Sequence, residues 1–186
     1  MKKIAITGLF TTTLLLSSCY STMLIKQTET PTATTTTQTQ TVEQVTPNTE
    51  VLSVKELIDL FAQQDNASAI AKKYGYKTKA GYEVFRVAKY DQMLYKNCRL
   101  AKIITDGKYE DYPRAQRAGV SSYVGMTSNE IIMGVFNDTA YQNLVSQVKM
   151  NGFTLDMEGN EDIYTNNTYY ISCNKNNRTI RIMRIG

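Results

Sequence analysis

Residues 137–152, NDTAYQNLVSQVKMNG, carry the clearest helix signal in the chain. Asn137 can cap the start of this helix, and Gly152 can end it. Between them the apolar residues recur at the spacing of one helix face, namely Tyr141, Leu144, Val145 and Val148. Three short β-rich segments follow at 153–158, 168–174 and 179–185, separated by turns rich in Gly, Asn and Asp. A helix followed by a three-stranded antiparallel sheet predicts an α+β fold.

A pair of helices is predicted earlier in the chain. Ser53-Val54-Lys55-Glu56 has the pattern of a capping box, in which the Ser and Glu side chains each bond the other residue's backbone N–H. Behind it, apolar residues share one helix face, namely Val54, Leu57, Ile58 and Phe61. Asp65-Asn66 offers the N-cap of a second, shorter helix, and Gly75 can end it.

Extended segments lie between the two helical parts. We expect strands at 82–87 and 92–104, the latter with Leu94, Cys98 and Leu100 on one side. Residues 121–136 predict one or two central strands, because apolar residues occur on both faces. Residues 108–118 are polar and contain Pro113, so they predict an irregular excursion.

The two halves of this region follow a similar order. A helix ends near Gly75 and again near Gly152, and a Cys preceded by a Tyr follows each at a similar distance, at Cys98 and Cys173. This order predicts that the helix-plus-three-strand unit is used twice as a tandem repeat, over 51–118 and 119–186. Chance similarity between common Gly and aromatic pairs is the open alternative.

The composition excludes several chemistries. Among its 186 residues the chain has no histidine, so it can build no Ser-His-Asp triad, Cys-His pair or His metal site. Its net charge is only +4, from 21 Lys and Arg against 17 Asp and Glu. Proteins dedicated to nucleic-acid binding carry a higher density of Lys and Arg on the binding surface. We therefore expect no enzymatic activity, no cofactor, no metal and no nucleic-acid partner.

The first residues have the features of an export signal. Met1-Lys2-Lys3 is a positive start, and residues 4–16 are apolar or carry Thr and Gly. As a helix this stretch is about 20 Å long, too short for a bilayer core of about 30 Å, so it predicts a cleaved signal peptide.

Leu16-Ser17-Ser18-Cys19 follows directly and resembles a bacterial lipobox, the site cut by signal peptidase II. The resemblance implies that residues 1–18 are removed and that Cys19 carries acyl chains, palmitate among them, which anchor the chain in a membrane. Tyr20, in place of the Asp that retains such proteins in the inner membrane, favours an outer-membrane position facing the periplasm. An ordinary secretory signal with a chance Cys is the alternative.

The residues after Cys19 are rich in Thr, Gln and Pro and poor in apolar side chains. Such a composition predicts a flexible tether rather than a packed core. The expected organisation is a signal peptide over 1–18, a lipidated Cys and tether over 19–50, and an α+β domain over 51–186.

The predicted element order also resembles two groups of envelope proteins. Tandem helix-plus-sheet modules resemble β-lactamase-inhibitory proteins, and a helix pair before three strands resembles the small lipoproteins of the outer-membrane barrel-assembly machine. Gly125-Met126-Thr127 is similar to a Gly-Met-Thr of the second group, although here it precedes a strand rather than a helix. The resemblance implies no functional residues.

Two sets of residues are candidates for chemistry. Cys98 and Cys173 would form a disulfide in an oxidising compartment, or stay two buried thiols. The acidic cluster Asp156, Glu158, Glu161 and Asp162 could hold Ca²⁺ or form a paired-carboxylate site, and a solvated hairpin turn is the simpler interpretation.

The last segment carries Arg178, Arg181 and Arg184, which would bind an anion or guard an edge strand against pairing. Lys72, Lys73, Lys77 and Lys79 flank the end of the predicted helix pair.

Tyrosines are the most suggestive binding residues, because Tyr offers a large contact area with few rotatable bonds. The candidates are Tyr82, Tyr95, Tyr112, Tyr169 and Tyr170, and half-buried packing is the alternative for each. We therefore expect a lipid-anchored adaptor domain that binds another envelope protein or a wall glycan through a Tyr-bearing sheet face or through residues 108–118. An enzyme-inhibitor or immunity-type module is the alternative.

Overall fold

The computed structural model describes residues 45–117 and 119–186. The predicted signal peptide, Cys19 and most of the predicted tether lie outside the described residues. Within the described part the helices are α1 (Val54–Ala62), the short 3₁₀ helix η1 (Gln64–Asn66), α2 (Ala67–Tyr74) and α3 (Asp138–Met150). None of these helices is long and apolar enough to cross a membrane.

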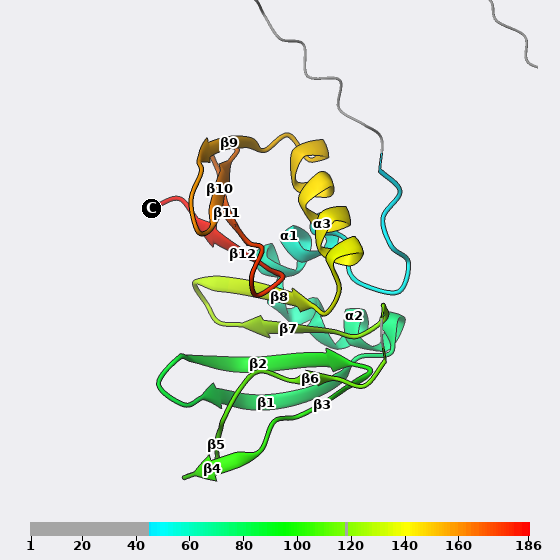
Figure 1. Ribbon diagram of the computed structural model, residues 1–186, viewed down its shortest axis with the longest axis vertical. Helices are drawn as coiled ribbons and strands as arrows, with labels where there is room; N and C mark the ends of the chain where they lie inside the picture. Colours follow the sequence, from blue (N-terminus) through cyan, green and yellow to red (C-terminus); the bar gives the residue numbers. More distant parts are fainter. Residues whose placement is uncertain (1–44, 118) are drawn as a thin grey trace, which may run out of the picture. The chain divides into compact units, whose positions relative to one another are not determined.

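One large sheet runs through the domain, in the order β4-β5-β1-β2-β7-β8-β12-β11-β10-β9, and a two-stranded sheet pairs β3 with β6 (Figure 1). Every pairing is antiparallel except that of β1 with β5. The strands are β1 (Lys77–Val84), β2 (Ala88–Lys96), β3 (Cys98–Arg99), β4 (Ile103–Thr105), β5 (Lys108–Tyr109), β6 (Arg114–Ala115), β7 (Ser122–Met126), β8 (Glu130–Val135), β9 (Thr154–Met157), β10 (Asp162–Thr165), β11 (Tyr169–Asn174) and β12 (Thr179–Arg184).

The α+β class is confirmed, and the tandem repeat is wrong. Strands of the two predicted halves join in one continuous sheet, because β7 pairs with β2 on one side and with β8 on the other. After α3 the chain forms four strands rather than three, and the last of them returns to pair with β8. No tandem three-strand unit is evident within the described residues.

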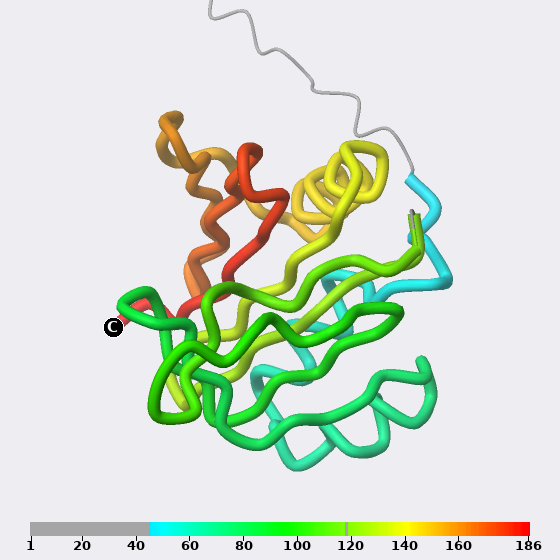
Figure 2. Tube along the Cα trace, turned by 60° about the horizontal axis from the view of Figure 1, so that its bottom comes forward, coloured from blue at the N-terminus to red at the C-terminus, as the bar shows by residue number. Residues whose placement is uncertain are grey.

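The helices cover one face of the sheet and form the main core with it. In Figure 2 the coils of α1 and α2 run along one side of the green strands. Leu57 and Phe61 of α1 and Leu144 of α3 are buried against side chains of β8 and β12. The local signals here behave as expected, since Ser53 and Glu56 form the capping box and the Asn137 side chain accepts a bond from the Ala140 amide at 2.8 Å.

On the opposite face of the sheet, Ala101 and Tyr112 from the chain between β2 and β7 pack with a set of aromatic rings. We call these rings the aromatic layer: Tyr82, Tyr90, Tyr109, Tyr112, Tyr123 and Phe136. Tyr82 stacks on Tyr109 at 4.1 Å between ring centroids, and its hydroxyl donates to the carbonyl of Asp111 at 2.8 Å. These two contacts hold residues 109–111 against the sheet.

Two glycines make room for the aromatic layer. A Cβ on Gly125 would lie 2.7 Å from the Tyr90 ring, and a Cβ on Gly134 would collide with the Tyr123 ring. Both rings therefore lie directly over the backbone of a neighbouring strand, a position that any side chain on that strand would block.

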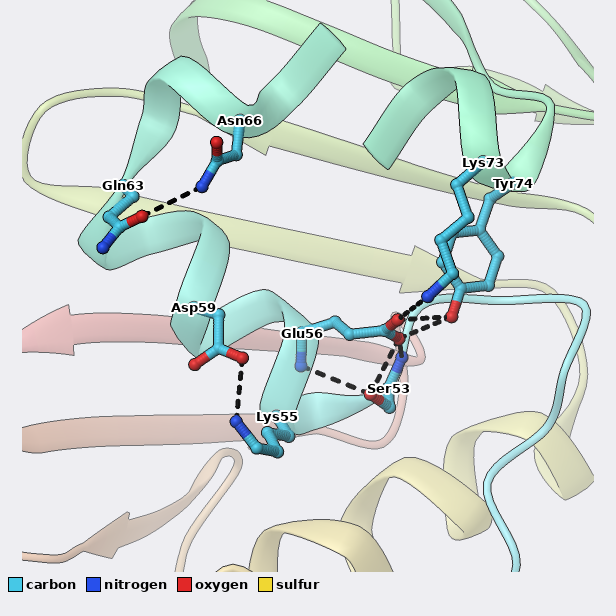
Figure 3. Close-up of polar contacts among 8 residues, drawn as sticks. All are labelled: Ser53, Lys55, Glu56, Asp59, Gln63, Asn66, Lys73 and Tyr74. Carbon is cyan, nitrogen blue, oxygen red and sulfur yellow. Dashed lines mark hydrogen bonds and ion pairs between the residues drawn. The ribbon is translucent and has the colours of Figure 1, made fainter. Parts of the chain in front are cut away.

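The helix pair is tied together by the carboxylate of Glu56 in α1 (Figure 3). It accepts hydrogen bonds from Lys73 at 2.8 Å and from the Tyr74 hydroxyl at 2.6 Å, both in α2, as well as from Ser53. Partial burial would raise the pKa of Glu56, but the bonds from Lys73, Tyr74 and Ser53 together outweigh it and lower the pKa to about 2.

The packed part of the chain begins before the predicted boundary at Val51. Asn143 of α3 donates to the carbonyl of Thr46 at 2.9 Å and accepts from the Asn48 amide at 3.3 Å. The buried side chain of Gln147, one turn later, accepts from the Val54 amide at 2.9 Å. Polar residues of α3 thus hold the segment that leads into α1.

Replacing Gly134 by Ala should destabilise the fold by about 1–3 kcal/mol, since the new methyl group must displace the Tyr123 ring. Urea unfolding measures this free energy. Gly159→Ala is the matched control, because a Cβ there meets only ordinary contact at 3.6 Å, and it should change stability by less than about 0.5 kcal/mol. Equal effects of the two substitutions would contradict the ring position.

Glu56→Gln should remove stability in a pH-dependent way. Because the folded-state pKa of Glu56 lies near 2, below its usual 4.5, its ionised form stabilises the fold fully above pH 4.5 and progressively less as the pH falls toward 2. The stability gap between wild type and variant, about 2 kcal/mol at neutral pH after allowance for solvent screening of the partly exposed carboxylate, should therefore close in that window.

Urea unfolding at several pH values checks this expectation. Asp59→Asn serves as the control, since the ion pair of Asp59 with Lys55 is solvent-exposed and should contribute less than about 0.5 kcal/mol. A gap for Glu56→Gln that stays constant down to pH 2 would show that its carboxylate is not the group responsible.

Candidate functional site

A cavity of about 500 Å³ opens on the face of the sheet opposite the helices. Its floor consists of the buried residues Tyr123, Ile132 and Thr179, which lie on β7, β8 and β12. One wall is the segment 111–115, and the other is formed by residues around Glu161 and Asn177. The volume lies within the range typical of small-ligand sites.

Aromatic rings form the apolar side of the cavity. Tyr112 stacks on Tyr123 with 5.3 Å between centroids and 22° between planes, and its hydroxyl lies 3.1 Å from that of Tyr90. Phe136 adds a tilted ring 6.0 Å from Tyr123. Tyr112 and Phe136 are half-buried, so they combine a fixed position with a surface that a ligand can reach.

Arg181 is the positively charged residue on the floor of the cavity. It lies on β12 between Ile180 and Ile182, which point into the helix-side core, so its side chain points to the cavity face. Its Nε is covered from solvent and has no hydrogen-bond partner among the described residues. The nearest carboxylate oxygen, on Glu130, lies 3.7 Å from Nε, beyond hydrogen-bond distance.

Glu161 faces Arg181 from the next wall. Its carboxylate accepts a hydrogen bond from the Asn174 side chain at 2.9 Å. That bond lowers the pKa of Glu161, burial opposes the effect, and Ser172 and the charge of Arg181 lower the pKa further. Glu161 is therefore ionised at neutral pH.

The wall of residues 111–115 carries one acid and one base. Arg114 is held by Glu110 at 2.6 Å. Asp111 accepts from the Tyr112 amide at 2.7 Å, and its side chain is exposed at the rim. The lining thus has two arginines and two carboxylates, and two further carboxylates, of Glu110 and Glu130, pair with the arginines.

Three phenols of the aromatic layer, those of Tyr82, Tyr90 and Tyr123, are not poised for proton transfer. Burial raises the pKa of Tyr82 to about 12, and burial also raises the pKa values of Tyr90 and Tyr123 above their usual range. Groups of this kind stay protonated at neutral pH and act as hydrogen-bond partners rather than as bases. The arrangement suits recognition better than catalysis.

The five tyrosines predicted as contact residues lie in different places. Tyr112 lines the cavity, whereas Tyr82 is fully buried beneath Tyr109 and positions the wall. Tyr95 packs against the edge of the aromatic layer. Tyr169 packs on the helix-side core, 5.9 Å from Phe61, and Tyr170 lies half-buried on the other face of β11.

Cys98 and Cys173 are buried free thiols, so the bridge left open by the sequence is not formed. Cys98 contacts the carbonyl of Ser122 in β7, and β8 and β12 separate β7 from β11, which carries Cys173. Three strand spacings of about 4.8 Å exceed the reach of a disulfide. Burial raises the pKa of Cys98 to about 11 and that of Cys173 to about 12, so neither is a thiolate.

The predicted acidic cluster is spread over a hairpin. Asp156 and Glu158 are exposed, while Glu161 turns into the cavity. No group of three or more Cys, Asp or Glu side chains suited to a metal ion is found in residues 45–117 and 119–186.

The predicted edge-guarding role of the arginines is wrong, because β12 lies inside the sheet between β8 and β11. Arg178 pairs with Asp138 at 2.6 Å, and Arg184 lies over the Phe61 ring. Phe136 and Thr179 were not among the residues predicted to form a site. Their role depends on which strands become neighbours, and no local pattern reveals that.

Exposed apolar side chains also lie at both ends of the sheet. Ile103 and Ile104 are on edge strand β4, and Leu155 and Met157 are on edge strand β9. Nothing in the described part of the chain shows what covers them.

No protein-family model matches the chain, and no curated protein or solved structure matches it. The function therefore has to be argued from the site.

Two thiols should become measurable only on unfolding. In a full-length Cys19→Ser chain, Ellman's reagent should find almost none at pH 8 in the native state, because both cysteines are buried and protonated, and two in urea without a reductant. Finding none in urea would mean that a disulfide is present.

Proposed function

We propose that this chain is a lipid-anchored protein of the bacterial cell envelope whose folded domain acts by binding, and that the aromatic cavity is its binding site. The main support for this binding site is the cavity of about 500 Å³, in which half-buried rings lie beside charged side chains. Concave sites with an apolar lining and a few converging polar groups are where proteins usually hold ligands.

Binding fits the cavity better than catalysis does. The cysteines are buried and protonated, the pKa values of Tyr90 and Tyr123 are raised by burial, and the sequence contains no imidazole. Glu161, the ionised acid of the cavity, is already bonded to Asn174. Such groups can form electrostatic contacts with a ligand without gaining or losing a proton, whereas general acid–base catalysis would require them to exchange protons.

The anchor part of the proposal rests on Leu16-Ser17-Ser18-Cys19, the lipobox-like motif. With Cys19 acylated in the outer membrane, residues 20–44 would give the domain a reach of about 30 Å toward the periplasm. The cavity would then meet a wall component or a segment of another envelope protein. If the partner is instead an enzyme that the domain blocks, the chain is the inhibitor or immunity-type module.

A site-specific photocrosslinking experiment tests both parts. The full chain is expressed with its own signal in a bacterium that has an outer membrane, with a photoreactive phenylalanine in place of Ala115, an exposed residue of the cavity wall. Irradiation should give a discrete adduct, seen as a new gel band or a mass shift. The matched control position is Gln142, which is exposed on α3 on the opposite face of the domain.

The outcomes separate the two parts. No adduct from position 115, or equal adducts from 115 and 142, would contradict the cavity as the binding site. Metabolic labelling with a palmitate analogue should label the wild type and not Cys19→Ser, and label retained in Cys19→Ser would contradict the anchor. An adduct that proves to be a lysozyme or a β-lactamase would favour the inhibitor alternative.

A further inference from the structure

Arg181 occupies an unusual position for a charged residue. Its strand lies inside the sheet, its register partners are the uncharged Ile132 of β8 and Ser172 of β11, and its ion pair with Glu130 is long, 3.7 Å from Nε to the carboxylate oxygen. The Nε–H is shielded from solvent without an acceptor among the described residues. A guanidinium that is only loosely paired can accept a further partner, and a ligand carboxylate would offer acceptors to its outer nitrogens.

Other arginines of the domain show what a satisfied pair looks like. Arg114 and Arg178 each contact a carboxylate oxygen at 2.6 Å, whereas the Nε of Arg181 is 3.7 Å from Glu130. The side chain of Arg181 is also 35% exposed, so a ligand can reach its outer nitrogens. A planar guanidinium matches the two oxygens of a carboxylate better than any other common anion except phosphate.

The acidic residues of the cavity favour a zwitterion over a simple anion as the ligand. Glu161, ionised beside Arg181, and Asp111 on the opposite wall would repel a ligand that carried only negative charge. A ligand with both a carboxylate and an ammonium group presents a charge of opposite sign to Arg181 and to Glu161, and it adds no net charge to the cavity.

The aromatic side of the cavity selects the body of the ligand. Tyr112, Phe136 and Ile132 offer apolar surface next to the charged groups. An aromatic or large aliphatic side chain would bury its area there, and an aromatic one would also stack on Tyr112.

We propose that the cavity binds a small zwitterion, an α-amino acid or dipeptide with an aromatic or large aliphatic side chain. Its carboxylate pairs with Arg181, its ammonium group faces Glu161, and its side chain lies against Tyr112 and Phe136. This assignment rests on the proposed function, since it names the ligand of the same cavity.

Calorimetric titration of the full chain, purified in detergent, tests the ligand class. The probes are L-phenylalanine, L-leucine and the dipeptide Ala-Phe, with phenylalanine amide, N-acetylphenylalanine and N-acetylglucosamine as matched analogues. At least one zwitterion should bind saturably, and removing its carboxylate or blocking its ammonium group should weaken binding at least about 10-fold. Amide and N-acetyl analogues that bind as tightly as the zwitterion would overturn the proposal.

Variants locate the contact. Arg181→Gln should weaken binding at least about 10-fold. Glu161→Gln should weaken binding of the zwitterion and of phenylalanine amide, whose ammonium group loses its partner, but not that of N-acetylphenylalanine, which has no ammonium group. Arg178→Gln, which removes an arginine outside the cavity, should bind like the wild type. Unchanged binding by Arg181→Gln would overturn the proposal, and the analogue series on the wild-type chain decides the matter if that variant does not fold.

The experiment distinguishes this inference from the proposed function. If none of the zwitterions binds while position 115 still gives a crosslinked adduct, the ligand class is wrong and the binding site stands. If position 115 also gives no adduct, both fail.

Discussion

The arrangement of this domain depends on two aromatic rings that lie directly over a neighbouring strand. Tyr90 occupies the space above Gly125, and Tyr123 occupies the space above Gly134. A side chain at either glycine would push the ring away from the sheet. With the rings in place, Tyr112 can stack on Tyr123 and hydrogen-bond to Tyr90, which fixes the wall above them. The cavity lies between this wall, residues 111–115, and the floor formed by β7, β8 and β12.

The two faces of the sheet therefore differ in composition and packing. The helix side is apolar and tightly filled, with leucines and isoleucines from α1, α3, β8 and β12, and the Glu56 carboxylate joins α1 to α2 at its rim. The opposite side replaces most of that aliphatic packing with tyrosines, whose hydroxyls need partners and whose rings leave an opening beside Arg181. The first face is thus closely packed, whereas the second leaves an open cavity.

Local signals predicted the parts of this fold that depend on neighbours in the sequence. The Ser53 and Asn137 caps, the left-handed Gly75 and the helix over residues 138–150 were all predictable, because each involves groups a few residues apart. The single strand predicted over 92–104 is instead divided among β2, β3 and β4, and the first break has a local reason. Asn97 has a positive φ of 51°, which ends β2 and separates Leu94 from Cys98 in the sheet.

The candidate site was less predictable, because it depends on strand order. The sequence pattern was consistent with Arg181 on an edge strand, and only the pairing of β12 with both β8 and β11 places it in a cavity floor. Tyr112 and the segment around it were predicted as a binding surface. Tyr82 was predicted with them, yet it is buried, since one tyrosine in a strand looks like any other until its face is known.

A double-mutant cycle between Gly134→Ala and Tyr123→Leu in the free energy of unfolding tests the central claim most directly, namely that the ring of Tyr123 needs the space above Gly134. With the ring replaced by a smaller side chain, the methyl group that Gly134→Ala introduces has room. Gly134→Ala should therefore cost at least about 1 kcal/mol less in the Tyr123→Leu background than in the wild type. Costs that agree within about 0.5 kcal/mol in the two backgrounds would contradict the account.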